Sequence, residues 1–409
     1  MVVGRDPSTG VRRTFRVARP VVGALPTRRS ESGAARSSRG VQVYFTGCGV
    51  VPSRMGNVRR MWIRSAAAAL AFAAVPGFAS ADGPRSFDLQ AHRGGLGLVV
   101  ENTLPAFANA LELGVSTLEL DVQITADGFA VVTHDRDPNP AKCVDTAPAF
   151  PGDPMFPYVP PATYIRDLTL AQVRTIDCGS KQQPDHPEQR TAPGARMPVL
   201  SEVFDLVRRY RADGVRLNIE TKVEAAAPEQ TAPRERFVRV VADEIHRAGI
   251  GPQVTIQSFD WGSLMRMREV APELPLVALT DGQKSLRVGE PGPSPWLGGI
   301  DIDDYPGSPQ EKFVAAATSF GAEVVSPVHG DPQDGTVTEP GYQAFTTAEL
   351  VRAAHRNGMR VIPWTIDDSA TMAALLDLGV DGLITNRPDV LRNVLSERGY
   401  PLPPSYPSP

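Results

Sequence analysis

Short apolar runs alternate with amphipathic stretches along the chain from Phe87 onward. The apolar runs have the length and composition of buried β-strands, and the stretches between them repeat apolar positions at helical spacing. This alternation is typical of βα units in a parallel sheet. The predicted strands are 87–92, 117–125, 215–222, 254–259, 275–280, 322–329, 360–366 and 381–386.

The helical pattern between these strands is clearest in five ranges, several of which end at a glycine that suits a helix C-terminus. These ranges are 104–113, 200–210, 237–248, 350–357 and 372–378. An open doubly wound sheet would be expected to carry a glycine-rich phosphate loop after its first strand. Eight strand–helix units favour instead a closed (β/α)8 barrel, the TIM barrel, in a domain of residues 82–409.

The alternation is interrupted once, at residues 136–197, where Pro, Gly and polar residues dominate and only 169–176 looks helical. We interpret this range as a long insertion after the second strand, on the active-site face of the barrel. Its apolar residues form either a small core of the insertion, which we favour, or an apolar rim. They are Phe150, Met155, Phe156, Tyr158 and Val159.

The N-terminal part of the chain differs in composition from the rest. Residues 1–54 are rich in Arg and cannot form a core. Residues 55–81 have the charged, apolar and small-residue order of a secretory signal peptide, with cleavage expected after Ala81. Translation is then expected to start at Met55 or Met61; the alternative is a genuine basic tail or transit peptide. We expect a periplasmic or secreted protein without stable membrane insertion.

The net charge and the cysteines indicate which class of partner and which cellular compartment to expect. The formal net charge of -4 excludes the overall basic field of a nucleic-acid-binding protein, so a small molecule is the expected partner. Cys143 and Cys178 remain after the leader is removed. In an oxidising compartment such a pair forms a disulfide, although two buried thiols are the alternative.

Charged residues interrupt two strands that should be apolar because a barrel covers both faces. Glu119 and Asp121 lie two residues apart, on one face of a strand, and Glu220 precedes Lys222 at the same spacing. Carboxylates that meet at one barrel end repel each other unless a hard divalent cation neutralises them. We therefore predict that the three carboxylates bind a metal. The alternative is a buried salt-bridge network with Lys222 and Arg93.

Two of the six histidines flank the strand of Glu119 and Asp121 in the sequence. His92 ends the first strand, and His134 ends a short apolar run after the carboxylate strand. Phosphoryl transfer needs one group that accepts a proton and another that donates one. We predict these roles for His92 and His134. Arg93 and the metal would supply positive charge to the phosphate oxygens.

In order and combination these motifs resemble the glycerophosphodiester phosphodiesterase family, over nearly all of residues 82–409. The motifs are His92-Arg93-Gly94-Gly95, Glu101-Asn102-Thr103, Glu119-Leu120-Asp121, His134-Asp135, Asn218-Ile219-Glu220-Thr221-Lys222, Gln257-Ser258-Phe259, Trp364-Thr365 and the run from Gly379 to Asn386.

The resemblance implies a metal-dependent hydrolase that converts small glycerophosphodiesters to sn-glycerol 3-phosphate and an alcohol. It implies one divalent cation, with Ca²⁺ preferred over Mg²⁺, and assigns Glu101 a supporting role. The long insertion is similar to that of the exported branch. The implied catalytic residues are His92 and His134, the metal ligands are Glu119, Asp121 and Glu220, and the substrate-binding residues are Arg93, Asn102, Lys222 and Trp364.

Two other functions stay open at this point. A barrel phosphodiesterase that cleaves lysophospholipids or phosphoinositides would use a similar site with an apolar, membrane-facing rim. A non-catalytic barrel could bind a phosphodiester without cleaving it. The complete set of histidines and carboxylates favours an enzyme over the second alternative.

Overall fold

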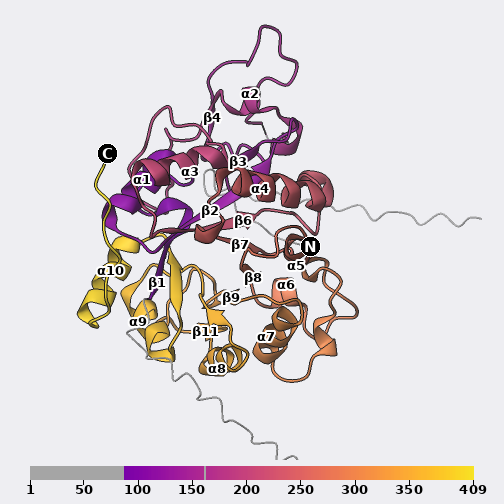
Figure 1. The fold of residues 1–409 in the computed structure, drawn as a ribbon, viewed down its shortest axis with the longest axis vertical. Helices are drawn as coiled ribbons and strands as arrows, with labels where there is room; N and C mark the ends of the chain where they lie inside the picture. The colour runs from indigo at the N-terminus through magenta and orange to yellow at the C-terminus, as the bar shows by residue number, and fades with distance from the viewer. Residues whose placement is uncertain (1–86, 161–162) are drawn as a thin grey trace, which may run out of the picture. The chain divides into compact units, whose positions relative to one another are not determined.

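Eight parallel strands form the centre of the domain (Figure 1). The computed structural model describes residues 87–160 and 163–409; the predicted segments 1–54 and 55–81 lie outside them. Neighbouring strands follow the order β12-β9-β8-β7-β6-β2-β1-β13. The parallel strands are β1 (Asp88–Ala91), β2 (Thr117–Ile124), β6 (Arg216–Thr221), β7 (Val254–Ser258), β8 (Leu276–Thr280), β9 (Val324–Pro327), β12 (Arg360–Val361) and β13 (Gly382–Thr385).

The two ends of this strand order meet and nearly close the barrel. The backbone N–H of Asp381 donates to Val361 O at 2.8 Å, and that of Ile384 donates to Pro363 O at 3.0 Å. β12 is shorter than the predicted strand 360–366 because the chain leaves regular strand geometry after Val361. All eight predicted strand positions carry a strand, and the predicted (β/α)8 barrel is confirmed.

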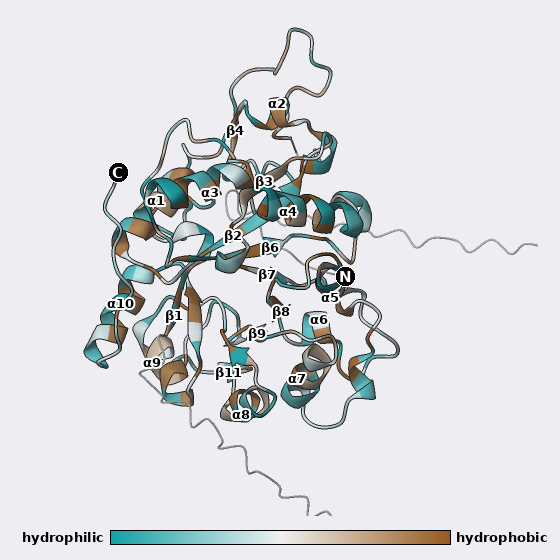
Figure 2. Ribbon diagram, in the orientation of Figure 1, coloured by the Kyte–Doolittle hydropathy of each residue, from teal (hydrophilic) through white to brown (hydrophobic). Residues whose placement is uncertain are grey.

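Helices follow the strands and surround them (Figure 1). Figure 2 shows hydrophilic and hydrophobic residues on different sides of several of these helices. Phe107 of α1, Phe204 of α3 and Phe237 of α4 are fully buried in the main hydrophobic core. No helix in the described residues is long and apolar enough to span a membrane. The helices are α1 (Leu104–Leu113), α2 (Leu170–Val173), α3 (Leu200–Arg209), α4 (Arg234–Ala248), α5 (Trp261–Val270), α6 (Gln283–Leu286), α7 (Pro309–Ser319), α8 (Ala348–Arg356), α9 (Ser369–Leu378) and α10 (Pro388–Glu397).

Strand β2 separates apolar from polar side chains. Leu118 and Leu120 belong to the main core, whereas Glu119 and Asp121 alternate with them and are also buried. Successive side chains of a strand point to opposite faces, so the two carboxylates point into the barrel. Parallel pairing with β6 then sets Asp121 opposite Glu220. The strand order thus brings together the carboxylates that were predicted to bind a metal.

Strand β3 (Ala130–Val132) pairs antiparallel with β2 and leads into residues 136–197, which we call the 136–197 segment. This segment contains β4 (Val144–Asp145), α2 and β5 (Ile176–Asp177), and it projects beyond β3 in Figure 1. Helix α2 is shorter than the predicted range 169–176 because the chain continues into β5. A disulfide joins Cys143 to Cys178 next to the β4–β5 pairing.

The apolar residues of the 136–197 segment divide into two groups. Tyr158 and Val159 are buried in a small separate core, as the favoured interpretation predicts. Phe150, Met155 and Phe156 instead expose 52%, 40% and 36% of their surface, so that interpretation is wrong for these three. They lie in a stretch with several prolines, and of the three only the ring of Phe156 packs against an aromatic ring of the small core within the described residues, edge-on to Tyr158 at 5.3 Å between centroids.

Candidate active site at the carboxyl ends of the barrel strands

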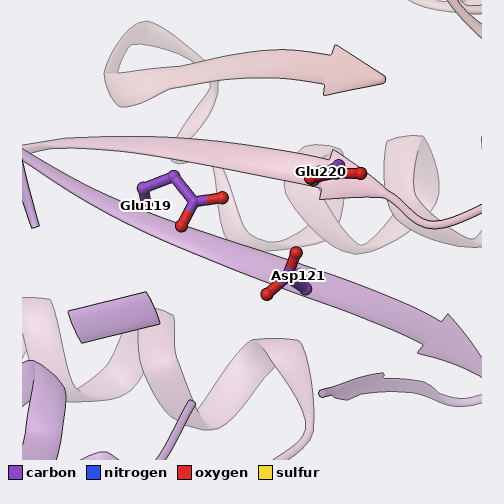
Figure 3. A group of neighbouring side chains, drawn as sticks. All are labelled: Glu119, Asp121 and Glu220. Atoms are coloured by element: carbon purple, nitrogen blue, oxygen red, sulfur yellow. The ribbon is translucent and has the colours of Figure 1, made fainter. Parts of the chain in front are cut away.

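Three buried carboxylates converge at the ends of β2 and β6 (Figure 3). Glu119, Asp121 and Glu220 are exposed by 1%, 1% and 6%. One oxygen atom from each lies within 4.8 Å of those of the other two. Oxygen atoms at this separation could coordinate one hard cation together.

Burial raises the pKa values of two of these groups. For Glu119 the pKa lies well above its usual range, because the charges of Asp121 and Glu220 add to the effect of burial. Burial also raises the pKa of Glu220 to about 7, although Lys222 opposes the shift. The Oδ1 atom of Asp121 is buried, and no described residue forms a hydrogen bond with it. The cluster therefore fits a bound cation, which would remove the repulsion and contact this oxygen.

Two cationic side chains also contact the cluster. The backbone N–H of Arg93 donates to Glu119 Oε2 at 2.8 Å, and its Nε lies 3.4 Å from Asp121 Oδ2. Lys222 Nζ lies 2.8 Å from Glu220 Oε1 and 3.8 Å from Asp121 Oδ1. The alternative salt-bridge network is thus present in part. It leaves Asp121 Oδ1 without a hydrogen bond, so it does not replace the metal interpretation.

The proton position on His92 follows from its neighbours. Asn386 donates from Nδ2 to Asp367 Oδ2 at 2.8 Å, because a carboxylate only accepts. Its Oδ1 therefore faces His92 and accepts from Nδ1 at 2.6 Å. The hydrogen lies on Nδ1, and the lone pair is on Nε2. Burial and the charge of Arg93 lower the pKa of His92 to about 3.

His134 is oriented by a carboxylate in place of an amide. Its Nδ1 donates to Asp135 Oδ1 at 2.7 Å, so its Nε2 also carries the lone pair. Burial, then the charges of Arg93 and Lys222, lower the pKa of His134 to about 4. Both histidines are consequently neutral at neutral pH, and each can accept a proton.

Both histidines line one cavity of about 260 Å³, together with Arg93, Lys222 and Trp364. A second cavity of about 450 Å³ also contains His134 and Lys222 in its lining, so the two adjoin. The smaller cavity has the size for a phosphate with a short polyol, and the adjoining one offers room for a further substituent.

The sequence and fold comparisons agree with this geometry. The model of the glycerophosphoryl diester phosphodiesterase family matches residues 92–390. The chain belongs to this family. A glycerophosphodiester phosphodiesterase from Caldanaerobacter subterraneus subsp. tengcongensis is 28% identical over 309 residues, which cover 76% of this chain and 98% of the relative. The crystal structure of a glycerophosphoryl diester phosphodiesterase from Silicibacter pomeroyi has a TM-score of 0.62 and 28% identity, and covers 78% and 95% of the two chains.

Family membership confirms the predicted family and enzyme class. In this phosphodiesterase, Arg93, Lys222 and Trp364 line the cavity that contains both histidines, and their predicted contact with substrate stays a prediction. Asn102 instead donates to Asp121 Oδ2 at 2.9 Å and does not line that cavity. Its predicted contact with substrate stays a prediction. Glu101 lies outside the three-carboxylate group and pairs with Arg93 at 3.3 Å, which fits a supporting role.

Sequence reasoning gave no role to several residues that orient the site. Gln257 donates to Glu119 Oε1 at 2.7 Å, and Asp135, Asn386 and Asp367 orient the two histidines. Asp135, Gln257 and Asn386 lie within the motifs of the family resemblance, so a signal for them was present. Asp367 gave no such signal, because only the fold brings it next to Asn386.

Proposed function

We propose that this chain hydrolyses glycerophosphodiesters to sn-glycerol 3-phosphate and an alcohol with one divalent cation, and that His92 and His134 are its acid and base. The observation that carries the proposal is the shared cavity in which two neutral, oriented histidines lie beside a buried carboxylate cluster with an oxygen that lacks a hydrogen bond. Glu119, Asp121 and Glu220 would hold the cation, which would supply positive charge to the phosphate oxygens when bound.

The two histidines differ in their partners, and this difference suggests their roles. The Asp135 carboxylate stabilises a protonated His134, which suits the base that takes a proton from the glycerol hydroxyl next to the phosphate. The resting His92 is neutral, so its Nε2 would take up a proton from solvent when the phosphodiester binds, because the anionic phosphate favours the charged imidazole. Asn386 is neutral, so this protonated His92 is the stronger acid and suits protonation of the departing alcohol oxygen. The hydroxyl then attacks phosphorus, and water opens the resulting cyclic phosphate.

Arg93 and Lys222 would bind the phosphate oxygens, and the adjoining cavity would receive the alcohol substituent. Both cations line the cavity that contains the histidines, so they can hold a diester between the acid and the base. Alignment of the reacting oxygen with the base is a large part of the rate enhancement in such reactions.

The identity of the cation and the location of the protein are further parts of the proposal. We propose Ca²⁺ in preference to Mg²⁺, on the family resemblance; a site made of carboxylates suits either ion. We also propose export, with removal of residues up to Ala81. The Cys143–Cys178 disulfide supports export, because disulfides persist in oxidising compartments. Mass measurement of the protein recovered from the periplasm or medium checks the cleavage site.

A lysophospholipid-cleaving enzyme is the second candidate, and the exposed Phe150, Met155 and Phe156 favour it. None of these three side chains lines either of the two cavities that contain His134. An acyl chain bound at the reaction centre would therefore not reach them through these cavities. We rank the water-soluble diester first. Turnover of glycerophosphocholine compared with lysophosphatidylcholine separates the two candidates.

The test of the main proposal is release of glycerol 3-phosphate from glycerophosphodiesters with and without a chelator. We expect release that the chelator abolishes and that Ca²⁺, more than Mg²⁺, restores. Undiminished release after complete metal removal would overturn the metal site. Absence of release under every metal condition, with a correctly folded protein, would overturn the proposed reaction.

A further inference from the structure

Lys142 of the 136–197 segment touches two carboxylates beside the proposed active site. Its Nζ lies 2.9 Å from Glu101 Oε1 and 3.0 Å from Asp135 Oδ2. Glu101 pairs with Arg93 at 3.3 Å, and Asp135 accepts a hydrogen bond from His134 at 2.7 Å. Lys142 thus contacts both the carboxylate that pairs with Arg93, the proposed phosphate ligand, and the carboxylate that accepts a hydrogen bond from His134, the proposed base.

The backbone around Lys142 is fixed by a short turn and a disulfide. The N–H groups of Lys142 and Cys143 both donate to Asn139 O, at 2.9 and 2.8 Å. The Asn139 side chain donates to Asp135 Oδ2 at 2.9 Å. Cys143, the next residue after Lys142, is bonded to Cys178. The position of the Lys142 side chain therefore depends on a turn that the disulfide holds at one end.

The chain beyond Cys178 contacts the same carboxylate from another side. Gln183 donates from Nε2 to Glu101 Oε2 at 2.8 Å, and its backbone N–H donates to Gln189 Oε1 at 2.9 Å. Gln189 in turn donates to the backbone oxygen of Leu96 at 2.8 Å, in a buried position. Both halves of the 136–197 segment thus reach Glu101, and the disulfide joins these halves.

We propose that Lys142, held in place by the Cys143–Cys178 disulfide, is a positioning residue that fixes Asp135 behind His134 and Glu101 behind Arg93. In this way the disulfide-bonded 136–197 segment completes the active site. The inference rests on the proposed roles of His134 and Arg93. It makes full activity depend on a bond that forms in an oxidising compartment.

The contacts of Lys142 differ from an ordinary surface ion pair, which contributes little. The side chain of Lys142 is 21% exposed, and those of Glu101 and Asp135 are 8% and 19% exposed. Burial alone would raise the pKa of Glu101, yet the charges of Arg93 and Lys142 outweigh it and lower that pKa to about 2. Without Lys142, two partly desolvated carboxylates would lose their shared cation and would turn toward water or toward other donors.

The first experiment compares Lys142→Met with Lys142→Arg in the full mature chain. Loss of an outer partner that orients an active-site group typically costs about 10- to 100-fold in activity. We expect Lys142→Met to lower kcat by about this factor with KM changed less than about twofold, and Lys142→Arg to retain most of kcat. A purely structural role would lower stability and leave kcat per folded molecule unchanged, and that result would overturn the proposal.

Arg174→Met is the matched control within the same segment. Arg174 forms an ion pair with Glu202 of α3 at 2.6 Å and contacts neither His134 nor Arg93. Its loss removes one cationic contact between the segment and the barrel, as Lys142→Met does. We expect unchanged kcat. If Arg174→Met and Lys142→Met lowered kcat equally, the effect would come from loosening of the segment, and the specific role of Lys142 would be wrong.

The second experiment tests the disulfide. Dithiothreitol supplies two electrons and two protons and converts the bond into two thiols. We expect lower kcat and faster amide hydrogen exchange in residues 135–143, whereas Cys143→Ser/Cys178→Ser should already show both effects and not respond to the reductant. If the disulfide acts through Lys142, adding Lys142→Met to the serine pair should cause little further loss. Full additivity of the two losses would overturn that link.

The exchange measurement separates failure of this inference from failure of the proposed reaction. If the wild-type protein shows no chelator-sensitive hydrolysis of glycerophosphodiesters, the proposed reaction is wrong. Exchange in residues 135–143 still reports whether Lys142 and the disulfide fix this turn. If amide hydrogen exchange in residues 135–143 were the same in wild type, in Lys142→Met and in Cys143→Ser/Cys178→Ser, the inference would be overturned whatever the activity.

Discussion

The two ends of the barrel both bury carboxylates, but they are neutralised fully at one end and only in part at the other. At the amino ends of the strands, Asp88 is 2% exposed and pairs with Arg216 at 2.9 Å and Arg360 at 3.2 Å. It also accepts from Thr117 at 2.7 Å. Burial would raise its pKa, yet the two arginines outweigh burial and hold that pKa below 3.8.

At the carboxyl ends the pKa values of Glu119 and Glu220 are raised and Asp121 Oδ1 lacks a hydrogen bond. Removing one partner of a fully paired buried charge destabilises the fold, whereas a buried charge with incomplete partners is held there by the rest of the structure. The difference supports the proposed active site at the carboxyl ends without any reference to a motif. It also predicts opposite consequences for substitutions at the two ends.

The largest expected effect is at the carboxyl ends. His92→Ala and His134→Ala should each lower kcat by about 10²- to 10⁴-fold, the usual scale of a general acid or base, with little change in substrate binding. Steady-state kinetics on glycerophosphocholine, with thermal unfolding as a control for folding, measures the loss.

A substrate with an activated aryl leaving group assigns the two roles. Such a leaving group needs no proton, so the variant without the acid should recover most of its rate. We expect recovery for His92→Ala and none for His134→Ala. Recovery of the opposite variant would reverse the assignment, and recovery of neither, in folded and metal-bound protein, would contradict both roles.

At the amino ends, Asp88→Asn should affect stability instead of activity. Hydrogen bonds to charged groups contribute about 1.5–3 kcal/mol, and the arginine partners are 39% exposed and retain water, so we expect a loss of about 1–2 kcal/mol. Urea unfolding measures it. Asp205→Asn, at a carboxylate with 59% exposure, is the control and should change little. A large fall in kcat for Asp88→Asn would contradict the assignment of stability to the amino ends and of activity to the carboxyl ends.

A smaller effect is expected where Asp367 orients Asn386. In Asp367→Asn, residue 367 can present either its oxygen or its NH₂ group, so Asn386 can turn and offer an NH₂ group to His92. The proton position on His92 would then no longer be fixed. We expect a fall in kcat of about 10-fold with KM nearly unchanged, and a mixed tautomer of His92 in ¹⁵N NMR spectra. A single Nδ1–H tautomer with unchanged kcat would show that Asp367 is not needed.

Most of the barrel could be predicted because its strands are short, buried and separated by periodic helices. Leu118 and Leu120 mark β2 as a buried strand, and that makes Glu119 and Asp121 stand out in the sequence. Strand order then brings Glu220 beside them. The two histidines of the cavity and the carboxylate cluster were therefore accessible to pattern reasoning.

The supporting contacts could not be predicted, because they join residues that are distant in the sequence. Asp367 reaches His92 through Asn386, and Lys142 reaches Glu101 across a turn of irregular backbone. The sequence gives no sign that Asp88 is paired, because only the fold brings Arg216 and Arg360 next to it. Such pairings depend on side-chain position in three dimensions, which hydrophobic periodicity does not encode.

The smallest predicted effect is the pH dependence of the contribution of Asp88 to stability. The pKa of Asp88 is lower in the folded protein than the ordinary 3.8, so folding favours its charged form. Its contribution to the free energy of unfolding is therefore complete above pH of about 4 and is lost as pH falls through the folded-state pKa. We expect the stability difference between wild type and Asp88→Asn to be constant from about pH 5 to 8 and to shrink below about pH 4. Urea unfolding in the presence of a chelator, so that no bound metal stabilises the protein, measures this difference. A difference that already disappears near pH 6 would mean that the arginines do not hold Asp88 in its charged form, and the contrast between the two ends would then have to rest on hydrogen bonding alone.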